Sequence, residues 1–197
     1  MTQPNMILAS ASPRRAELLR QIGVRFVVAP ANIDESQQLG ESPADYVVRM
    51  AVKKATAGYS RQASDLPFMG ADTAVVCGEQ IFGKPSCKDN ALYMLDQLSG
   101  RTHQVLSAVA MTTGVDTKVR LSTTAVTFRT ISQQECLNYW QTQEPLGKAG
   151  AYAIQGKAAL FVTHLEGSYS GVVGLPLAET EQLLKHFAVP LWQTVSP

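Results

Sequence analysis

The sequence has almost no net charge and no long apolar run. Its 17 lysines and arginines nearly balance 16 aspartates and glutamates, which leaves a formal net charge of +1. A chain so balanced has no general electrostatic attraction for nucleic acid or for an anionic membrane. The longest apolar runs, such as residues 6–9 and 73–77, are far too short to span a bilayer. Any site for a polyanion must therefore be made from a few placed cations.

Cysteines and familiar catalytic motifs are also scarce. Cys77, Cys87 and Cys136 form neither a zinc-binding spacing nor a disulfide framework, and the first five residues lack the pattern of a signal peptide. These features predict a reduced, cytoplasmic protein. The sequence has no Walker A loop, no Gly-x-Gly-x-x-Gly after a strand and no Gly-x-Ser-x-Gly elbow.

The order of the expected elements predicts an α/β fold with a mixed sheet. Hydrophobic residues make up 45% of the 197 residues, enough to bury the core of one domain, with room for two lobes. The middle of the chain reads as hairpins, whereas the rest alternates strands with helices. Strands are expected at residues 6–10, 24–29, 68–77, 102–111, 118–128 and 158–165, with a short one before Lys84. Helices are expected to begin at Ser12-Pro13, Ser42-Pro43, Ser86, Ser132 and Pro176, and residues 167–174 read as a turn-rich return.

The first candidate site is the turn from Ser10 into the first helix, which carries Arg14 and Arg15 in its first turn. A helix N-terminus already attracts anions, and arginine there opposes the helix dipole. A bound phosphate would resolve that conflict. Helical phase places Arg15 with the apolar stripe, where its side chain could reach a cleft at the strand end. The alternative is two solvated arginines on a surface helix.

Two further charged residues fall among apolar neighbours. Lys54 lies on the same helical face as Met50 and Ala51, so it either extends to solvent or meets an anion. Asp72 lies inside an apolar strand, where a buried charge needs a metal, a lysine or hydrogen bonds to offset its desolvation. Such a group can act as a base or a ligand. The alternative is that Asp72 ends the strand and caps a turn.

Three loop positions offer weaker signals. Glu35, next to Asp34, could supply a carboxylate to a metal, although an acidic pair is usually just solvated. Lys84 follows a short strand, where a lysine is usually at the surface. Gln155 has an amide that can pair with the edge of a pyrimidine, but a glutamine that ties down its loop is equally plausible.

Together these segments resemble the Maf family of nucleoside triphosphate pyrophosphatases. The similar segments occur in the family's order from about residue 6 to residue 187, so the resemblance covers nearly the whole chain and favours a single domain over residues 1–197. They are residues 8–15, 33–35, 70–73, 83–85, 148–152, 154–156 and 173–176. The resemblance implies a mixed central sheet and a cleft between two lobes, as in the inosine triphosphate pyrophosphatases.

The resemblance also implies a substrate. Arg14, Thr73 and Gln155 occupy the three positions that separate substrate branches, and their combination is similar to the branch that hydrolyses dTTP and UTP to the monophosphate and pyrophosphate. In the 7-methyl-GTP branch these positions are typically tryptophan, glutamine and glutamate. The residues expected to hold the triphosphate are Ser10, Arg14, Arg15, Lys54 and Lys84.

A divalent cation, magnesium or manganese, is a further implication of the resemblance. Glu35 and Asp72 are expected to lie near it, with Asp72 as the general base. Gln155 would pair with the uracil or thymine edge, beside Thr73. Two rival hypotheses remain: a house-cleaning pyrophosphatase for modified nucleotides, and a non-catalytic nucleotide sensor that regulates cell division. No nucleic-acid or membrane partner is expected, and family members are often dimers, which leaves a homodimer open.

Overall fold

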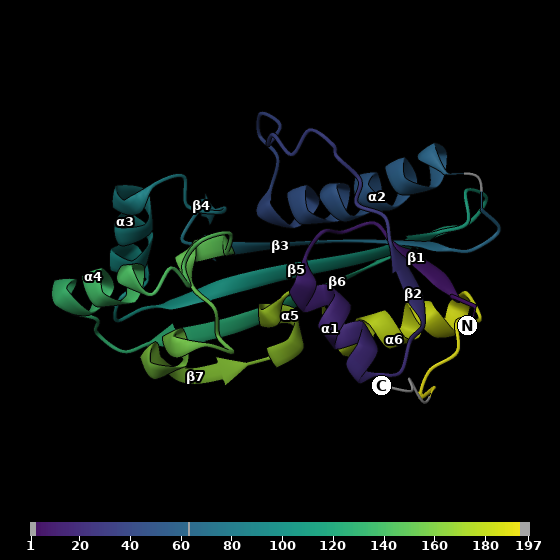
Figure 1. The fold of residues 1–197 in the computed structure, drawn as a ribbon. Helices are drawn as coiled ribbons and strands as arrows, with labels where there is room; N and C mark the ends of the chain where they lie inside the picture. Colours follow the sequence, from purple (N-terminus) through teal and green to yellow (C-terminus); the bar gives the residue numbers. More distant parts are fainter. Residues whose placement is uncertain (1–2, 63, 194–197) are drawn as a thin grey trace. The chain divides into compact units, whose positions relative to one another are not determined.

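The computed structural model describes residues 3–62 and 64–193 and confirms an α/β fold with a mixed sheet (Figure 1). The sheet has seven strands in the order β2-β1-β3-β5-β6-β7, and β4 pairs with β3. Strand β1 is parallel to β2 and β3, whereas the β3–β4 and β6–β7 pairs are antiparallel. The strands are β1 Met6–Leu8, β2 Phe26–Val28, β3 Phe68–Cys77, β4 Gln80–Phe82, β5 Thr102–Thr112, β6 Thr117–Phe128 and β7 Val162–Glu166.

The helices are α1 Pro13–Gln21, α2 Pro43–Arg61, α3 Lys88–Leu98, α4 Gln133–Gln141, α5 Tyr169–Val173 and α6 Leu177–His186, with short 3-10 helices η1 Ala149–Ala151 and η2 Lys157–Phe161. Most begin where the sequence predicts a cap. Ser42 and Ser132 each accept a hydrogen bond from the third residue of their helix, and Ser132 forms a complete capping box with Glu135. Within the described residues, no helix is both long enough and apolar enough to cross a membrane.

The chain divides into two compact units. The first comprises the residues up to Asp72, Ser107–Ser122 and the residues from Gly174 onward, and the second comprises Thr73–Leu106 and Thr123–Val173. Strands β3, β5 and β6 each contribute residues to both units.

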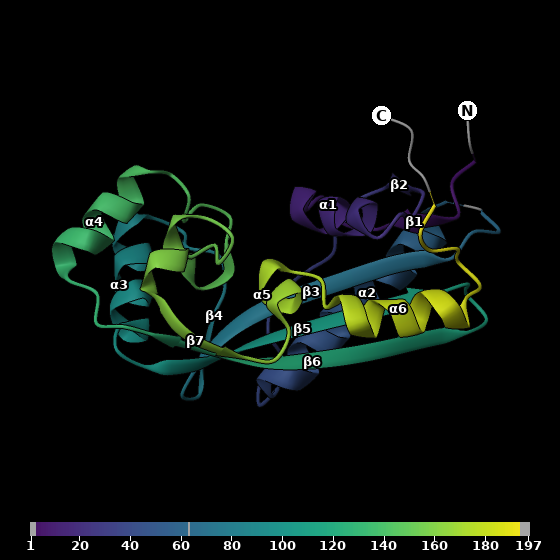
Figure 2. The same cartoon turned by 90° about the horizontal axis from the view of Figure 1, so that it is seen from below.

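The order of strands in the first unit explains where its helices lie. Strand β1 lies between β2 and β3, so α1 and α2 connect parallel strands in opposite directions along the sheet. Because such crossovers are right-handed, the two helices must cover opposite faces. Figures 1 and 2 show α2 on one face, and α1 and α6 on the other. In open α/β sheets, ligands bind beyond the carboxyl ends of the strands, at the point where the connections change direction along the sheet.

Helix α2 packs close to the sheet because a glycine lies on each side of the contact. Gly70 of β3 faces the backbone of α2, and Gly58 of α2 faces the side chains of Ala9 and Phe68. A Cβ atom at Gly70 in β3 would lie 2.3 Å from the carbonyl oxygen of Ala51 and 2.4 Å from the amide nitrogen of Ala55. On the helix side, a Cβ at Gly58 would lie 3.0 Å from the side chains of Ala9 and Phe68. The backbones of α2 and β3 therefore approach at a distance that only glycine permits at residue 70.

The first two strands are shorter than predicted, at Met6–Leu8 and Phe26–Val28, and three other segments differ in their cap or in the kind of element. Helix α3 is capped at Cys87 rather than Ser86, because Asn90 accepts a hydrogen bond from the Ser86 amide and holds it outside the helix. Residues 157–161 form η2 before β7 begins. Residues 169–173 form α5, where the Ser168 hydroxyl accepts a hydrogen bond from the Gly171 amide. The glycines at 167, 171 and 174 had indicated turns only.

Candidate active site

The first cluster of the candidate site forms where β1 leads into α1. The Arg15 guanidinium donates from Nη1 to Ser10 Oγ at 3.0 Å, and from Nε to the carbonyl oxygen of Gly174 at 2.9 Å. Burial lowers the pKa of Arg15, the charges of Asp72 and Glu35 raise it, and the charge of Arg14 lowers it. The Arg15 side chain is thus directed back toward the end of β1, as its helical phase predicts.

Arg14 is half-buried on the same helical turn, and burial lowers its pKa. Ser12, at the N-cap of α1, makes no side-chain hydrogen bond to the first helical turn, as far as the described residues show. The N-terminal amides of α1, Ser10 and the two guanidinium groups together form a positively charged end of a helix. Such an end is suited to a phosphate. The contribution of Arg14 to substrate selection stays a prediction.

The second cluster is a buried lysine between two carboxylates. Lys54 Nζ lies 2.7 Å from Asp72 Oδ1 and 2.9 Å from Glu35 Oε1. The side chains of Lys54 and Asp72 are 9% and 11% exposed, whereas that of Glu35 is 46% exposed. Lys54 therefore meets anions rather than extending to solvent, and the charge of Asp72 inside β3 is offset by a lysine. The burial of both residues agrees with their apolar positions in the sequence.

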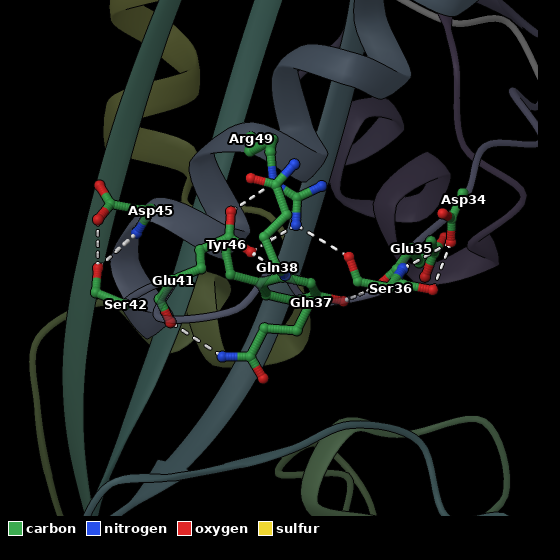
Figure 3. A network of polar contacts seen from close by, with 10 residues as sticks. All are labelled: Asp34, Glu35, Ser36, Gln37, Gln38, Glu41, Ser42, Asp45, Tyr46 and Arg49. Carbon is green, nitrogen blue, oxygen red and sulfur yellow. Dashed lines mark hydrogen bonds and ion pairs between the residues drawn. The ribbon is translucent and has the colours of Figure 1, made fainter.

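The loop that carries Glu35 is held against α2 by hydrogen bonds from Tyr46 and Arg49 (Figure 3). Tyr46 Oη donates to the carbonyl oxygen of Glu35 at 3.0 Å, and Arg49 Nη2 donates to the carbonyl oxygen of Ser36 at 3.0 Å. Arg49 also binds both carboxylate oxygens of Glu41 through two N–H groups. Since Tyr46, Arg49 and Lys54 all come from α2, the helix places Glu35 and its partner together.

Asp34, the neighbour of Glu35, is used differently. Its Oδ1 atom accepts hydrogen bonds from the amide and the hydroxyl of Ser36, at 2.9 and 2.6 Å, which forms a local turn. These two bonds lower the pKa of Asp34. Of the acidic pair at 34–35, Glu35 is the residue that reaches the buried lysine.

The two acids also bear on the expected metal. Across residues 3–62 and 64–193, no group of three or more histidine, cysteine, aspartate or glutamate side chains could hold a metal ion. Magnesium, however, is often bound by one or two carboxylates together with substrate phosphates. Glu35 and Asp72 supply such hard oxygen ligands, and both already share one cation, the Lys54 ammonium. The donor set fits a metal that arrives with phosphates and does not fit an all-protein metal cage.

The remaining predicted residues belong to the second unit. Thr73 is half-buried in β3, Lys84 is exposed after β4, and Gln155 is exposed in the loop before η2. The turn that precedes Lys84 is held to η1, because the Gly150 amide donates to the carbonyl oxygen of Gly83 at 3.1 Å. The roles of Thr73, Lys84 and Gln155 stay predictions.

Sequence reasoning did not single out Tyr46 and Arg49, which fasten the loop of Glu35. Helical phase shows only that Arg49 lies off the apolar stripe of α2. A usable signal was present in Glu41, whose acidic side chain lies just before the helix that carries Arg49. The Gly174 carbonyl group, 159 residues from its partner Arg15, left no local signal at all.

Comparison with known proteins shows which proteins the chain is similar to. A family model described as "Maf-like protein" matches residues 5–187. The chain is 50% identical to the dTTP/UTP pyrophosphatase of Saccharophagus degradans over 98% of this chain and 93% of that protein. It is 51% identical to the dTTP/UTP pyrophosphatase of Pseudoalteromonas atlantica, over 93% of this chain and 97% of that protein. Among solved structures, the Staphylococcus aureus Ham1 protein is similar with a TM-score of 0.49 and 13% identity, over 93% of this chain and 97% of that chain.

Proposed function

Because the chain belongs to the Maf-like family, we propose that it hydrolyses dTTP and UTP to the nucleoside monophosphate and pyrophosphate. Relatives that are about half identical over nearly the full chain carry the name of that activity. The observation that carries the proposal is the buried pair of Lys54 and Asp72, joined by the more exposed Glu35, with the charge of Arg15 beside it. In this pair the Lys54 ammonium, a group that can bind phosphate, lies next to a carboxylate that can accept a proton.

The triphosphate is held by placed cations, because the chain as a whole is nearly neutral. Arg14 and Arg15, at the N-terminus of α1, would bind the phosphates together with the hydroxyl of Ser10. Arginine binds phosphate through two parallel N–H groups, and lysine binds it as a point charge. Lys54 provides a buried ammonium, and Lys84 is the fourth cation of the proposal.

Asp72 is the general base. It accepts a proton from the water molecule whose oxygen forms a bond to the α-phosphorus. The bond between the α-phosphorus and its bridging oxygen breaks, and pyrophosphate leaves with that oxygen. Burial beside α2 keeps the carboxylate in a fixed position, which favours a single geometry of attack. The positive charges of Arg15 and Lys54 stabilise the charge that develops on the phosphate oxygens.

Glu35 and Asp72 would hold the divalent cation, magnesium or manganese, at the edge of the phosphate site. A bound divalent cation offsets negative charge and orients phosphate oxygens. Lys54 lies between the same two acids. It therefore keeps both carboxylates together and offsets one of their two negative charges.

Base selection rests on Gln155 and Thr73. The amide of Gln155 can donate one hydrogen bond and accept another, which matches the alternating edge of uracil or thymine. Acceptance of both dTTP and UTP requires that neither the 5-methyl group nor the 2′-hydroxyl group is strongly selected. Arg14 is the third residue of this combination.

The direct test is pyrophosphate release by the purified chain across canonical and modified triphosphates, with and without magnesium. UTP and dTTP should give the highest kcat/KM, and chelation of magnesium should abolish release. Faster hydrolysis of a purine triphosphate would contradict the pyrimidine assignment, and UTP binding without pyrophosphate release would contradict an enzyme. Gln155→Glu should reduce kcat/KM for UTP while the midpoint of thermal unfolding stays unchanged.

A further inference from the structure

The backbone on both sides of Gln155 is anchored by two side chains, Tyr139 and Glu144. The Ala153 amide donates to Tyr139 Oη at 3.1 Å, and Tyr139 Oη donates to Glu144 Oε1 at 2.8 Å. Beyond Gln155, the amides of Lys157 and Ala158 donate to the Glu144 carboxylate at 3.0 and 3.3 Å. One tyrosine and one carboxylate thus connect residues 153 and 157–158 through a single hydrogen-bonded chain.

The chemistry of the two side chains suits this task. Tyr139 is 4% exposed, and its pKa is raised by burial and then by its hydrogen bond to Glu144. Its hydroxyl therefore stays protonated and donates to the carboxylate while it accepts from Ala153. Burial alone would raise the pKa of Glu144, but its hydrogen bonds with Lys157, Tyr139 and Ala158 bring it below the ordinary value. At neutral pH the carboxylate is ionised, and charged acceptors form the stronger hydrogen bonds.

Gly156 makes this approach possible. A Cβ atom at residue 156 would lie 2.5 Å from the carboxyl carbon and both oxygens of Glu144. Any larger residue would have to push the carboxylate away from the amides that it holds. The Gly156 amide also donates to the carbonyl oxygen of Ala153 at 3.0 Å, which closes a tight turn around residues 154 and 155.

Gln155 itself is exposed, so packing does not fix its position. Its direction depends on the backbone of this turn, and that backbone is fixed by the anchors on either side. A selective hydrogen bond to a base edge needs a donor and an acceptor within a few tenths of an ångström of their places. A turn whose backbone is held on both sides can position an exposed side chain with this precision, whereas a loop without such contacts cannot.

We propose that Tyr139 and Glu144 are positioning residues for Gln155, and that through it they set the base selectivity of the pyrophosphatase reaction. This inference rests on the proposed function and adds two residues, outside the phosphate site, that act on selectivity. A purely structural role would lower stability without altering the choice of base. The two roles therefore differ in the ratio of kcat/KM for UTP to kcat/KM for CTP.

The experiment compares that ratio in the unchanged chain and in Glu144→Ala, Glu144→Gln, Tyr139→Phe, Gly156→Ala and Gln155→Ala. Glu144→Ala should lower the ratio about tenfold, equivalent to one hydrogen bond of about 1.4 kcal/mol, mainly through a higher KM for UTP. Glu144→Gln keeps an oxygen acceptor and should recover part of the ratio. Gly156→Ala should resemble Glu144→Ala, and the double variant should be little worse than either alone, because both remove the same contact.

Glu135→Gln is the matched control, since Glu135 is another carboxylate of the second unit that caps a helix through backbone N–H and hydroxyl groups. It should lower the unfolding midpoint and leave the UTP/CTP ratio unchanged. Hydrogen exchange of the amides at 153, 157 and 158 should be faster in Glu144→Ala and unchanged in Glu135→Gln. Hydrogen exchange does not depend on catalysis, so it tests the anchoring of the turn even in a variant with low activity.

An unchanged ratio in Glu144→Ala and Tyr139→Phe, when Gln155→Ala lowers it, would overturn the positioning role and leave the proposed function intact. A lower ratio in Glu144→Ala with no change in Gln155→Ala would also overturn it, because the effect would then not pass through Gln155. If the unchanged chain releases no pyrophosphate from UTP, the proposed function itself is wrong. If Glu144→Ala does not fold, Tyr139→Phe and Gly156→Ala decide the matter.

Discussion

Lys54 Nζ lies 2.7 Å from Asp72 Oδ1, in a place where both side chains are about nine-tenths buried. Removal of one partner from a buried ion pair leaves the other charge without compensation, which typically costs about 3–5 kcal/mol. Lys54→Met should therefore lower the free energy of unfolding by about 3 kcal/mol. The double variant Lys54→Met/Asp72→Leu should recover much of that loss in urea denaturation. Full additivity of the two changes would show that the pair is not coupled.

Asp72→Asn should separate binding from turnover. The amide keeps the size of the side chain but cannot accept the proton of the attacking water, so kcat for UTP should fall by about two to four orders of magnitude. The Kd for UTP should change little, because Arg15 and Lys54 remain. Titration calorimetry and pyrophosphate release measure the two quantities, and near-normal kcat would rule out Asp72 as the base.

Gly70→Ala should disturb the Lys54–Asp72 pair by moving the backbones of α2 and β3 apart. The added Cβ meets the Ala51 carbonyl group and the Ala55 amide, neither of which can rotate away, so α2 must move from β3. Overpacking of this kind costs about 1–3 kcal/mol or more. Thermal unfolding should show a clear loss, together with reduced kcat. Gly83→Ala is the control, since a Cβ there meets nothing within 4 Å, and a comparable loss in it would contradict the explanation.

Arg49→Gln should loosen the loop of Glu35. The variant loses the ion pair with Glu41 and the bond to the Ser36 carbonyl group, so the Gln38 amide, which donates to Glu41, should exchange faster. If Glu35 holds the metal, half-maximal activity should need about tenfold more magnesium. Lys53→Gln, an exposed change on the same helix, should have neither effect. An unchanged magnesium requirement in Arg49→Gln would argue against this positioning role.

His103 should make stability depend on pH. It lies buried among Phe128 and Tyr152, and burial lowers its pKa from 6.5 to about 4. Between these values the unfolded chain binds a proton that the folded chain does not, so the unfolding free energy falls as pH falls. The slope is about 1.4 kcal/mol per pH unit. His103→Phe should remove this contribution in urea titrations between pH 7 and pH 4, whereas the exposed His164→Phe should retain it.

Local sequence signals predicted much of the fold. The bounds of β3 were predicted correctly at both ends, because Gly78 and the loop before Phe68 limit a mostly apolar segment. The Ser132–Glu135 capping box was also read from spacing alone. Residues 158–161 were predicted as strand but belong to η2, since the amides that begin η2 are held by Glu144, a residue outside the segment.

The candidate site was predicted less completely. The apolar neighbours of Lys54 and Asp72 offered burial as one of two alternatives for each residue, because an isolated charge in such a segment needs a partner. The family resemblance implied that Glu35 and Asp72 lie near each other, but the ion pair of Glu35 with Lys54 was not predicted, since it depends on a loop held by Tyr46 and Arg49. Side-chain to backbone contacts between distant segments leave no period or spacing in the sequence.

The division of the chain into two units has a consequence for its evolution and its engineering. The changes from one unit to the other at 72–73, 106–107 and 122–123 fall inside β3, β5 and β6, so neither unit is encoded by one continuous stretch. Neither can be excised, fused or exchanged by cutting the gene at a single place. A one-residue deletion in β3 would turn every later side chain of that strand to the opposite face. Substitutions are thus the accessible route of change in these strands, and insertions belong in the loops that join them.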